Sequence, residues 1–144
     1  MANLYILTGP PGSGKSTYYD HHAQTGDLEV NIDNLPTNLE VRERLRLRRH
    51  VLQESIQAAK EQGVDVWFHT GAPTSTQRAH WVHIAQQSGI PVRVFIFLTP
   101  RAVCLERIMV RDGSAALSPG VRRWFKSYES PSGKELAYTT IIRV

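Results

Sequence analysis

Short apolar segments alternate with longer amphipathic segments along the whole chain. The apolar segments have the length expected of buried or half-buried strands, and they cover residues 3–8, 28–32, 64–68, 92–98 and 137–144. The segments between them space their apolar residues as helices do, and they cover residues 15–25, 39–62, 75–88, 100–111 and 119–129. Strands that alternate with helices predict a doubly wound, mostly parallel five-stranded α/β sheet with helices on both faces.

Length and composition predict one globular domain over residues 1–144. No apolar run approaches the length of a membrane span, and the first residues lack the basic start of a signal peptide. A single cysteine, Cys104, cannot form an internal disulfide. We therefore expect a cytoplasmic protein that does not associate with membranes. The sequence does not predict the oligomeric state.

The formal net charge is +4, and the basic residues are clustered. One cluster lies on the predicted helix over 39–62, where we favour a solvated helix face over contact with a polyanion. The other lies in the last third of the chain, where we favour a functional role over a solvated helix face. Its members are Arg101, Arg107, Arg111, Arg122, Arg123 and Lys126.

A glycine-rich segment between the first predicted strand and helix matches the pattern G-x-x-x-x-G-K-[ST] over residues 9–16. Glycines allow a tight loop whose backbone N–H groups surround a phosphate chain, and the helix after the loop favours negative charge at its N-terminus. Lys15 can reach the β- and γ-phosphates, and the Ser16 hydroxyl can ligate Mg²⁺. The predicted ATP-binding residues here are Gly9, Gly12, Ser13, Gly14, Lys15, Ser16 and Thr17.

The acids near the strand ends favour phosphoryl transfer over ATP hydrolysis. A water-activating ATPase normally has an acid at the end of an apolar strand, but the third strand here ends at His69 and the fourth at Thr99. Asp33 follows the second strand, where a carboxylate can accept the proton of an acceptor hydroxyl. Asp33 could instead stabilise a turn, because Asp-Asn is common in turns.

Two arginines four residues apart, Arg107 and Arg111, end a predicted helix and precede a segment of small residues. We expect a helical lid over about residues 107–121, whose arginines clamp the transferred phosphate. The alternative is a favourable interaction between a basic helix end and the helix dipole.

Taken together, the chain resembles the kinase domain of phage-type 5′-polynucleotide kinases, within the small P-loop kinases. The resemblance rests on the glycine-rich loop, on Asp33, and on the Arg107–Arg111 segment with the small-residue linker and helix after it. It also rests on Thr70, Arg78 and Trp81 after the third strand. It implies transfer of phosphate from ATP, with Mg²⁺, to the 5′-hydroxyl of DNA or RNA. Lys15, Asp33 and Arg111 would be the catalytic residues.

The chain departs from that family near the acceptor. Pro36 stands where the family usually has an arginine, which makes Arg42 the nearest candidate to bind substrate beside Asp33 and Thr70, and His69 stands where the family has an acid. Two alternatives therefore remain. One is a kinase of the same fold that acts on a nucleoside, sugar or antibiotic. The other is a P-loop ATPase or nucleotide-dependent regulatory module.

Overall fold

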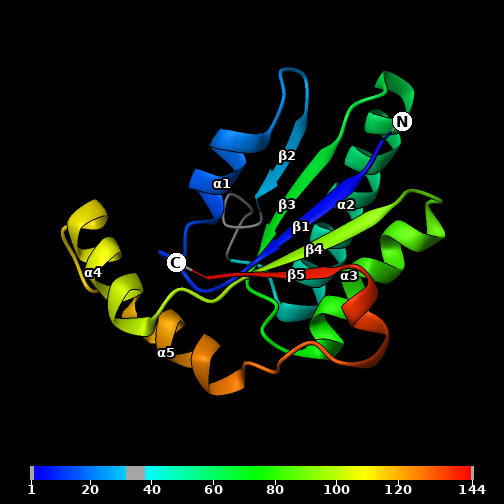
Figure 1. Cartoon of the computed structure of the whole chain (residues 1–144). Helices are drawn as coiled ribbons and strands as arrows, with labels where there is room; N and C mark the ends of the chain where they lie inside the picture. Colours follow the sequence, from blue (N-terminus) through cyan, green and yellow to red (C-terminus); the bar gives the residue numbers. More distant parts are fainter. Residues whose placement is uncertain (1, 32–37, 144) are drawn as a thin grey trace.

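The structure, a computed structural model, describes residues 2–31 and 38–143. Its core is a five-stranded sheet with the order β2-β3-β1-β4-β5 (Figure 1). All four strand pairs are parallel. The strands are β1 (Leu4–Thr8), β2 (Leu28–Asn31), β3 (Val66–Thr70), β4 (Val92–Phe97) and β5 (Thr139–Ile142). The predicted doubly wound α/β fold is confirmed.

The helices also follow the predicted order. They are α1 (Lys15–His22), α2 (Val41–Gln62), α3 (Ser75–Gln87), α4 (Arg101–Asp112), α5 (Ser118–Ser127) and a short 3-10 helix, η2 (Gly133–Ala137). Two boundaries differ from expectation. β3 begins and ends two residues later than predicted, so His69 and Thr70 belong to the strand rather than to a loop. Residues 133–137, expected as part of a turn and the start of a strand, form η2 because Ser132 and Glu135 make a capping box.

Successive side chains of a strand point to opposite faces of the sheet, and this alternation separates two cores. One face carries Leu4, Ile6 and Phe68, which pack with α2, α3 and Trp124. The other face carries Leu7, Trp67 and Phe97, which pack with aromatic residues of β1, β4 and α1. Helices α2 and α3 therefore cover one face and α1 covers part of the other, while α4 and α5 extend past the carboxyl ends of the strands (Figure 1).

Arg78 is the largest fully buried side chain among the described residues, and it ties the last part of the chain to α3. Its Nε lies 2.9 Å from a carboxylate oxygen of Glu135. Its other nitrogens donate to the carbonyl oxygens of Pro73, at 2.7 Å, and Glu129, at 2.8 Å. Each of the three guanidinium nitrogens thus donates to protein, which gives Arg78 a structural role and positions the segment that leads into β5.

No helix in the described ranges is both long enough and apolar enough to cross a membrane.

Candidate active site

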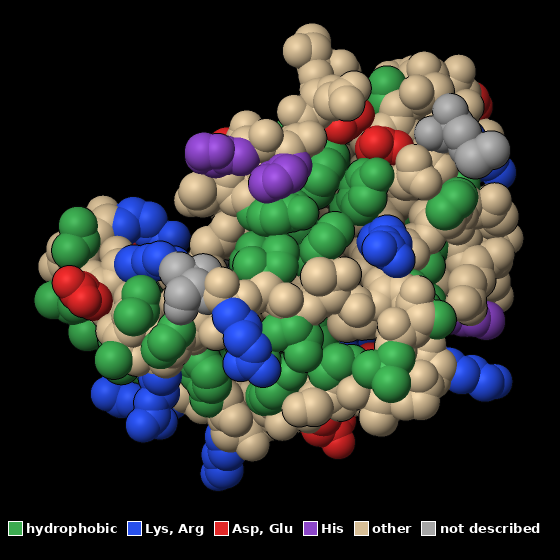
Figure 2. Space-filling model, in the orientation of Figure 1, with side chains coloured by type: hydrophobic (Ala, Val, Ile, Leu, Met, Phe, Trp, Pro, Cys, Tyr) green, Lys and Arg blue, Asp and Glu red, His purple; other side chains and the backbone are tan. Residues whose placement is uncertain are grey.

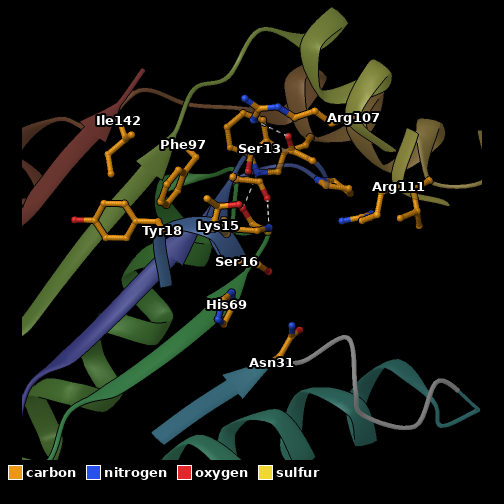
Figure 3. A pocket seen from close by; sticks show the side chains of 18 of the residues that line it. Ser13, Lys15, Ser16, Tyr18, Asn31, His69, Phe97, Arg107, Arg111 and Ile142 are labelled. Carbon is orange, nitrogen blue, oxygen red and sulfur yellow. Dashed lines mark hydrogen bonds between the residues drawn. The ribbon is translucent and has the colours of Figure 1, made fainter. Parts of the chain in front are cut away.

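A cavity of about 880 Å³ opens at the carboxyl ends of the strands, where parallel α/β sheets bind their ligands (Figure 3). The glycine-rich loop, α1, α4, α5 and the ends of β2 and β3 contribute to its lining. Apolar side chains gather across the middle of this side of the molecule, with histidines beside them and basic side chains toward α4 (Figure 2). The cavity thus joins a polar, basic end to an apolar one.

The backbone of the loop requires glycine at two points. Gly12 has a φ of 78°, and a Cβ atom there would lie 2.7 Å from the carbonyl oxygen of Cys104 in α4. Gly14 has a φ of 104° and is the N-cap of α1. Both conformations are strained for any other residue. Glycine at position 12 allows α4 to pack closely against the loop, and glycine at position 14 allows α1 to begin with its N-terminus facing the cavity.

Lys15 crosses the loop that it follows. Its Nζ donates a hydrogen bond of 2.6 Å to the carbonyl oxygen of Gly9 (Figure 3). A Cβ atom on Gly9 would lie 2.6 Å from the Ser13 hydroxyl, so the first glycine also keeps the loop closed. The buried Ser13 hydroxyl has no hydrogen-bond partner in the described part of the chain. The loop therefore places an ammonium group and a buried hydroxyl at the position where a phosphate chain would bind.

The predicted lid arginines reach the same cavity from α4. Arg107 Nη1 donates to the carbonyl oxygen of Gly12 at 3.3 Å, which ties α4 to the loop. Arg111 also lines the cavity, and its Nε lies 2.8 Å from the carboxylate Oδ1 of Asp112. Hydrogen bonding by Arg111 lowers the pKa of the Asp112 carboxyl. Beneath them, Cys104 and Ile108 of α4 pack on Val121 of α5.

The opposite wall is formed by the ends of β2 and β3. The His69 side chain, only 4 % exposed, points into the cavity between Ser16 and Asn31 (Figure 3). Its Nε2 lies 2.9 Å from a carboxylate oxygen of Glu29 on the neighbouring strand, and the Tyr19 ring meets it edge-on at 5.6 Å. Glu29 and Tyr19 therefore contact an imidazole that faces the cavity.

The structure places the predicted site residues in three groups. All seven loop residues and both lid arginines line the cavity: Gly9, Gly12, Ser13, Gly14, Lys15, Ser16, Thr17, Arg107 and Arg111. Thr70, buried at the end of β3, and Arg42, exposed on the first turn of α2, are not among the lining residues. Asp33 lies outside the described residues; Asn31, two positions earlier, lines the cavity.

Within the described residues, no carboxylate stands at the end of β1, β3 or β4. His69 and Thr70 end β3, and Thr99 follows β4. The Thr99 hydroxyl donates a 2.7 Å hydrogen bond to the Ser13 carbonyl oxygen of the loop. Where water-activating ATPases carry acids at strand ends, this chain carries the imidazole of His69 and the hydroxyl of Thr99, which binds the loop.

Several lining residues were not assigned to the site from the sequence. Asn31 and His69 could have been assigned from their place at strand ends, where polar side chains of a parallel sheet converge. The aromatic and apolar end of the cavity has no local sequence signal, because it assembles from three distant segments: Tyr18 of α1, Phe97 of β4 and Ile142 of β5 (Figure 3).

Solved structures with the same fold include several kinases. The chain is similar to a gluconokinase from Sinorhizobium meliloti 1021, with 19% identity, a TM-score of 0.65, and coverage of 99% of this chain and 82% of that one. It is similar to a chain of the Pnkp1/Rnl/Hen1 RNA repair complex, with 18% identity and a TM-score of 0.70 over 88% of this chain and 43% of that one. The tunicamycin resistance protein of Deinococcus radiodurans is 17% identical, with a TM-score of 0.61 over 99% and 86%.

These likenesses show that the chain has the α/β fold of P-loop kinases. The sequence itself matches a family profile over residues 4–128, a span that includes the glycine-rich loop, the cavity wall at β2 and β3, and all of α5. The chain therefore belongs to the family described as "AAA domain".

Proposed function

We propose that this protein is an ATP-dependent kinase that transfers the γ-phosphoryl group to the 5′-hydroxyl of a polynucleotide. The observation that carries the proposal is the shared cavity: Lys15 of the loop and Arg107 and Arg111 of α4 converge on it. A transferring phosphoryl group spreads negative charge over its oxygens, and cations on opposite sides stabilise that charge.

Asp33 is the proposed general base. It accepts the proton of the acceptor hydroxyl. The oxygen of that hydroxyl forms a bond to the γ-phosphorus, and the bond between the γ-phosphorus and the β–γ bridging oxygen breaks. The products are the phosphorylated acceptor and ADP. Lys15 and the loop amides orient the phosphates for in-line attack by the acceptor oxygen. Arg111, on the lid over residues 107–121, binds the oxygens of the phosphoryl group as it is transferred.

The residues present fit Mg²⁺ bound together with ATP. Ser16 lines the cavity from the first turn of α1, so its hydroxyl can supply one oxygen ligand. Mg²⁺ usually takes one or two protein ligands and completes its six positions with phosphate oxygens and water. The described residues contain no cluster of three or more His, Cys, Asp or Glu side chains that could hold a metal ion. The bound ion would neutralise charge on the β- and γ-phosphates.

A polynucleotide acceptor is supported by charge and by analogy of fold. The chain carries a net charge of +4, and one protein of similar fold belongs to an RNA repair complex. Cationic proteins attract phosphate chains over long distances.

A small-molecule acceptor is the second candidate, since a gluconokinase shares the fold and a cavity of about 880 Å³ lies within the range of small-ligand sites. The third candidate is an ATPase or a nucleotide-dependent regulatory module, which would bind ATP in the same loop without an acceptor.

The test is to follow labelled γ-phosphate from ATP with Mg²⁺ in the presence of competing acceptors. The panel contains 5′-hydroxyl DNA and RNA oligonucleotides, nucleosides, and gluconate, and Lys15→Met serves as the control for a contaminating kinase. Label on oligonucleotides that disappears with Lys15→Met supports the proposal. Label only on nucleosides or gluconate would move the assignment to the second candidate, and release of free phosphate alone would move it to the third.

A further inference from the structure

The first half of α2 holds a charge equal to that of the whole chain. Residues 41–50 contain five arginines and one glutamate, Glu43, a net charge of +4, and the chain as a whole has a net charge of +4. The rest of the chain is therefore formally neutral. None of these arginines forms an ion pair with any described residue. They are Arg42, Arg44, Arg46, Arg48 and Arg49.

The same half-helix leaves an apolar stripe uncovered. At about 100° per residue, Val41, Leu45, Leu52, Ile56 and Ala59 fall within about 60° of one another around the helix. Leu52, Ile56 and Ala59 are buried against the sheet. Val41 and Leu45 are 64% and 46% exposed. The stripe that anchors the second half of α2 in the core thus continues into solvent in the first half.

Arginines border this exposed stripe on both sides. Arg42, Arg46 and Arg49 follow one edge of it, and Arg44 and Arg48 follow the other, by the same helical geometry. The helix dipole adds positive charge at the same end. Five cations at the positive end of a helix repel one another, and binding of a polyanion relieves that repulsion.

The fold places this surface near the carboxyl ends of the strands, where the candidate active site lies. Because β2 and β3 are parallel, the helix that connects them must begin at their carboxyl ends. Asn31 at the end of β2 lines the cavity. In Figure 3, α2 lies on one side of Asn31 and the glycine-rich loop lies on the other. A ligand on the first half of α2 can therefore extend toward the cavity.

We infer that residues 41–50 form a docking surface for single-stranded nucleic acid, with phosphates on the arginines and bases against Val41 and Leu45. The inference rests on the proposed function, because it identifies where the polynucleotide lies beyond its reacting end. Charge complementarity selects a polyanion, and an apolar strip between two cationic rows suits a strand whose bases are unpaired. A sugar acceptor has no phosphate chain that could bind these arginines.

The experiment measures binding of a fluorescein-labelled 12-nucleotide single strand to the full chain, without ATP, over a series of KCl concentrations. The test variant is Arg46→Gln/Arg49→Gln. The matched control is Arg93→Gln/Lys134→Gln, which removes two exposed charges elsewhere. Loss of two phosphate contacts should reduce the slope of log K against log salt by about 1.4, because each contact contributes about 0.7 on single strands. We expect about tenfold weaker binding at low salt, with the control within twofold of wild type.

Leu45→Ser tests the apolar stripe separately. It should weaken binding of the single strand while leaving the salt slope unchanged, since no charge is removed. A duplex of equal length should bind more weakly than the single strand. Equal binding by wild type and Arg46→Gln/Arg49→Gln would overturn the inference, as would binding to vesicles containing phosphatidylserine without binding to the oligonucleotide.

The inference and the proposed function fail in different ways. If wild type phosphorylates oligonucleotides and the double arginine variant binds them as tightly, the docking surface is refuted and the kinase assignment stands. If no oligonucleotide is phosphorylated while nucleosides are, the polynucleotide assignment is refuted, whatever binds to α2.

Discussion

The Thr99 hydroxyl lies 2.7 Å from the carbonyl oxygen of Ser13, and this hydrogen bond joins the residue after β4 to the phosphate-binding loop. Both residues are buried. Replacing Thr99 by valine keeps the shape but leaves a buried carbonyl without its donor, at a cost of about 1–3 kcal/mol. We expect Thr99→Val to lower the melting temperature and to weaken ATP binding, measured by calorimetry. Thr99→Ser retains the hydroxyl and should preserve ATP affinity, whereas equal losses in both variants would argue against this role.

Gly12 and Gly113 allow the strain of a positive φ to be separated from a steric clash. Their φ angles are 78° and 64°, so alanine costs about 1–2 kcal/mol of backbone strain at either position. Only at Gly12 would the new Cβ meet backbone, at 2.7 Å from the Cys104 carbonyl oxygen. We expect Gly12→Ala to lose ATP binding and Gly113→Ala to retain it, with denaturant unfolding reporting the larger stability loss for Gly12→Ala. Similar behaviour of the two variants would contradict the packing of α4 on the loop.

Arg111 is expected to act in the transition state. Removing an arginine that stabilises a transferring phosphoryl group lowers kcat by on the order of 10³-fold. Arg111→Ala should therefore lose kcat with little change in ATP affinity. Arg111→Lys should recover only part of the rate, because lysine lacks the planar fork. Arg101→Ala is the control, since Arg101 is exposed on the same helix and does not line the cavity. A kcat for Arg111→Ala equal to that of the control would exclude the clamp.

The buried pair of Arg78 and Glu135 should make stability depend on pH. Burial acts to raise the pKa of the Glu135 carboxyl, but hydrogen bonds from Arg78 and Ser75 outweigh it, so the pKa lies below its ordinary value of 4.5. The folded state then favours the carboxylate, and this stabilisation is present above pH 4.5 and is lost as the pH falls through the lowered pKa. Glu135→Gln should flatten the fall in unfolding free energy below pH 4.5, measured by urea titration. An unchanged pH profile would show that other carboxyls account for the dependence.

The sequence was sufficient for the parts of the site that local chemistry determines. The glycine-rich loop needs consecutive residues with special backbone angles, so its seven predicted residues all appear in the cavity lining. Arg107 and Arg111 were predicted because four residues make about one helical turn. The order of strands and helices followed from periodicity, and the parallel sheet followed from that order.

The parts that could not be predicted depend on contacts between distant segments. β3 extends to Thr70 because it pairs with β1 as far as Thr8, a register that no local pattern reveals. The pairing of His69 with Glu29 joins two strands that are separated by all of α2. Arg78, noted only as a family feature, is a structural residue because its partner Glu135 lies 57 positions away.

Asp33→Asn shows whether a carboxylate at position 33 activates the acceptor hydroxyl. The measurement is the rate of transfer of labelled γ-phosphate to a 5′-hydroxyl oligonucleotide, together with ATP affinity and the release of free phosphate. We expect Asp33→Asn to lose transfer by at least on the order of 10²-fold, while its ATP affinity stays within a few-fold of wild type. Free phosphate as the only product, released equally by both proteins, would refute Asp33 as the general base and identify an ATPase or a nucleotide-dependent switch.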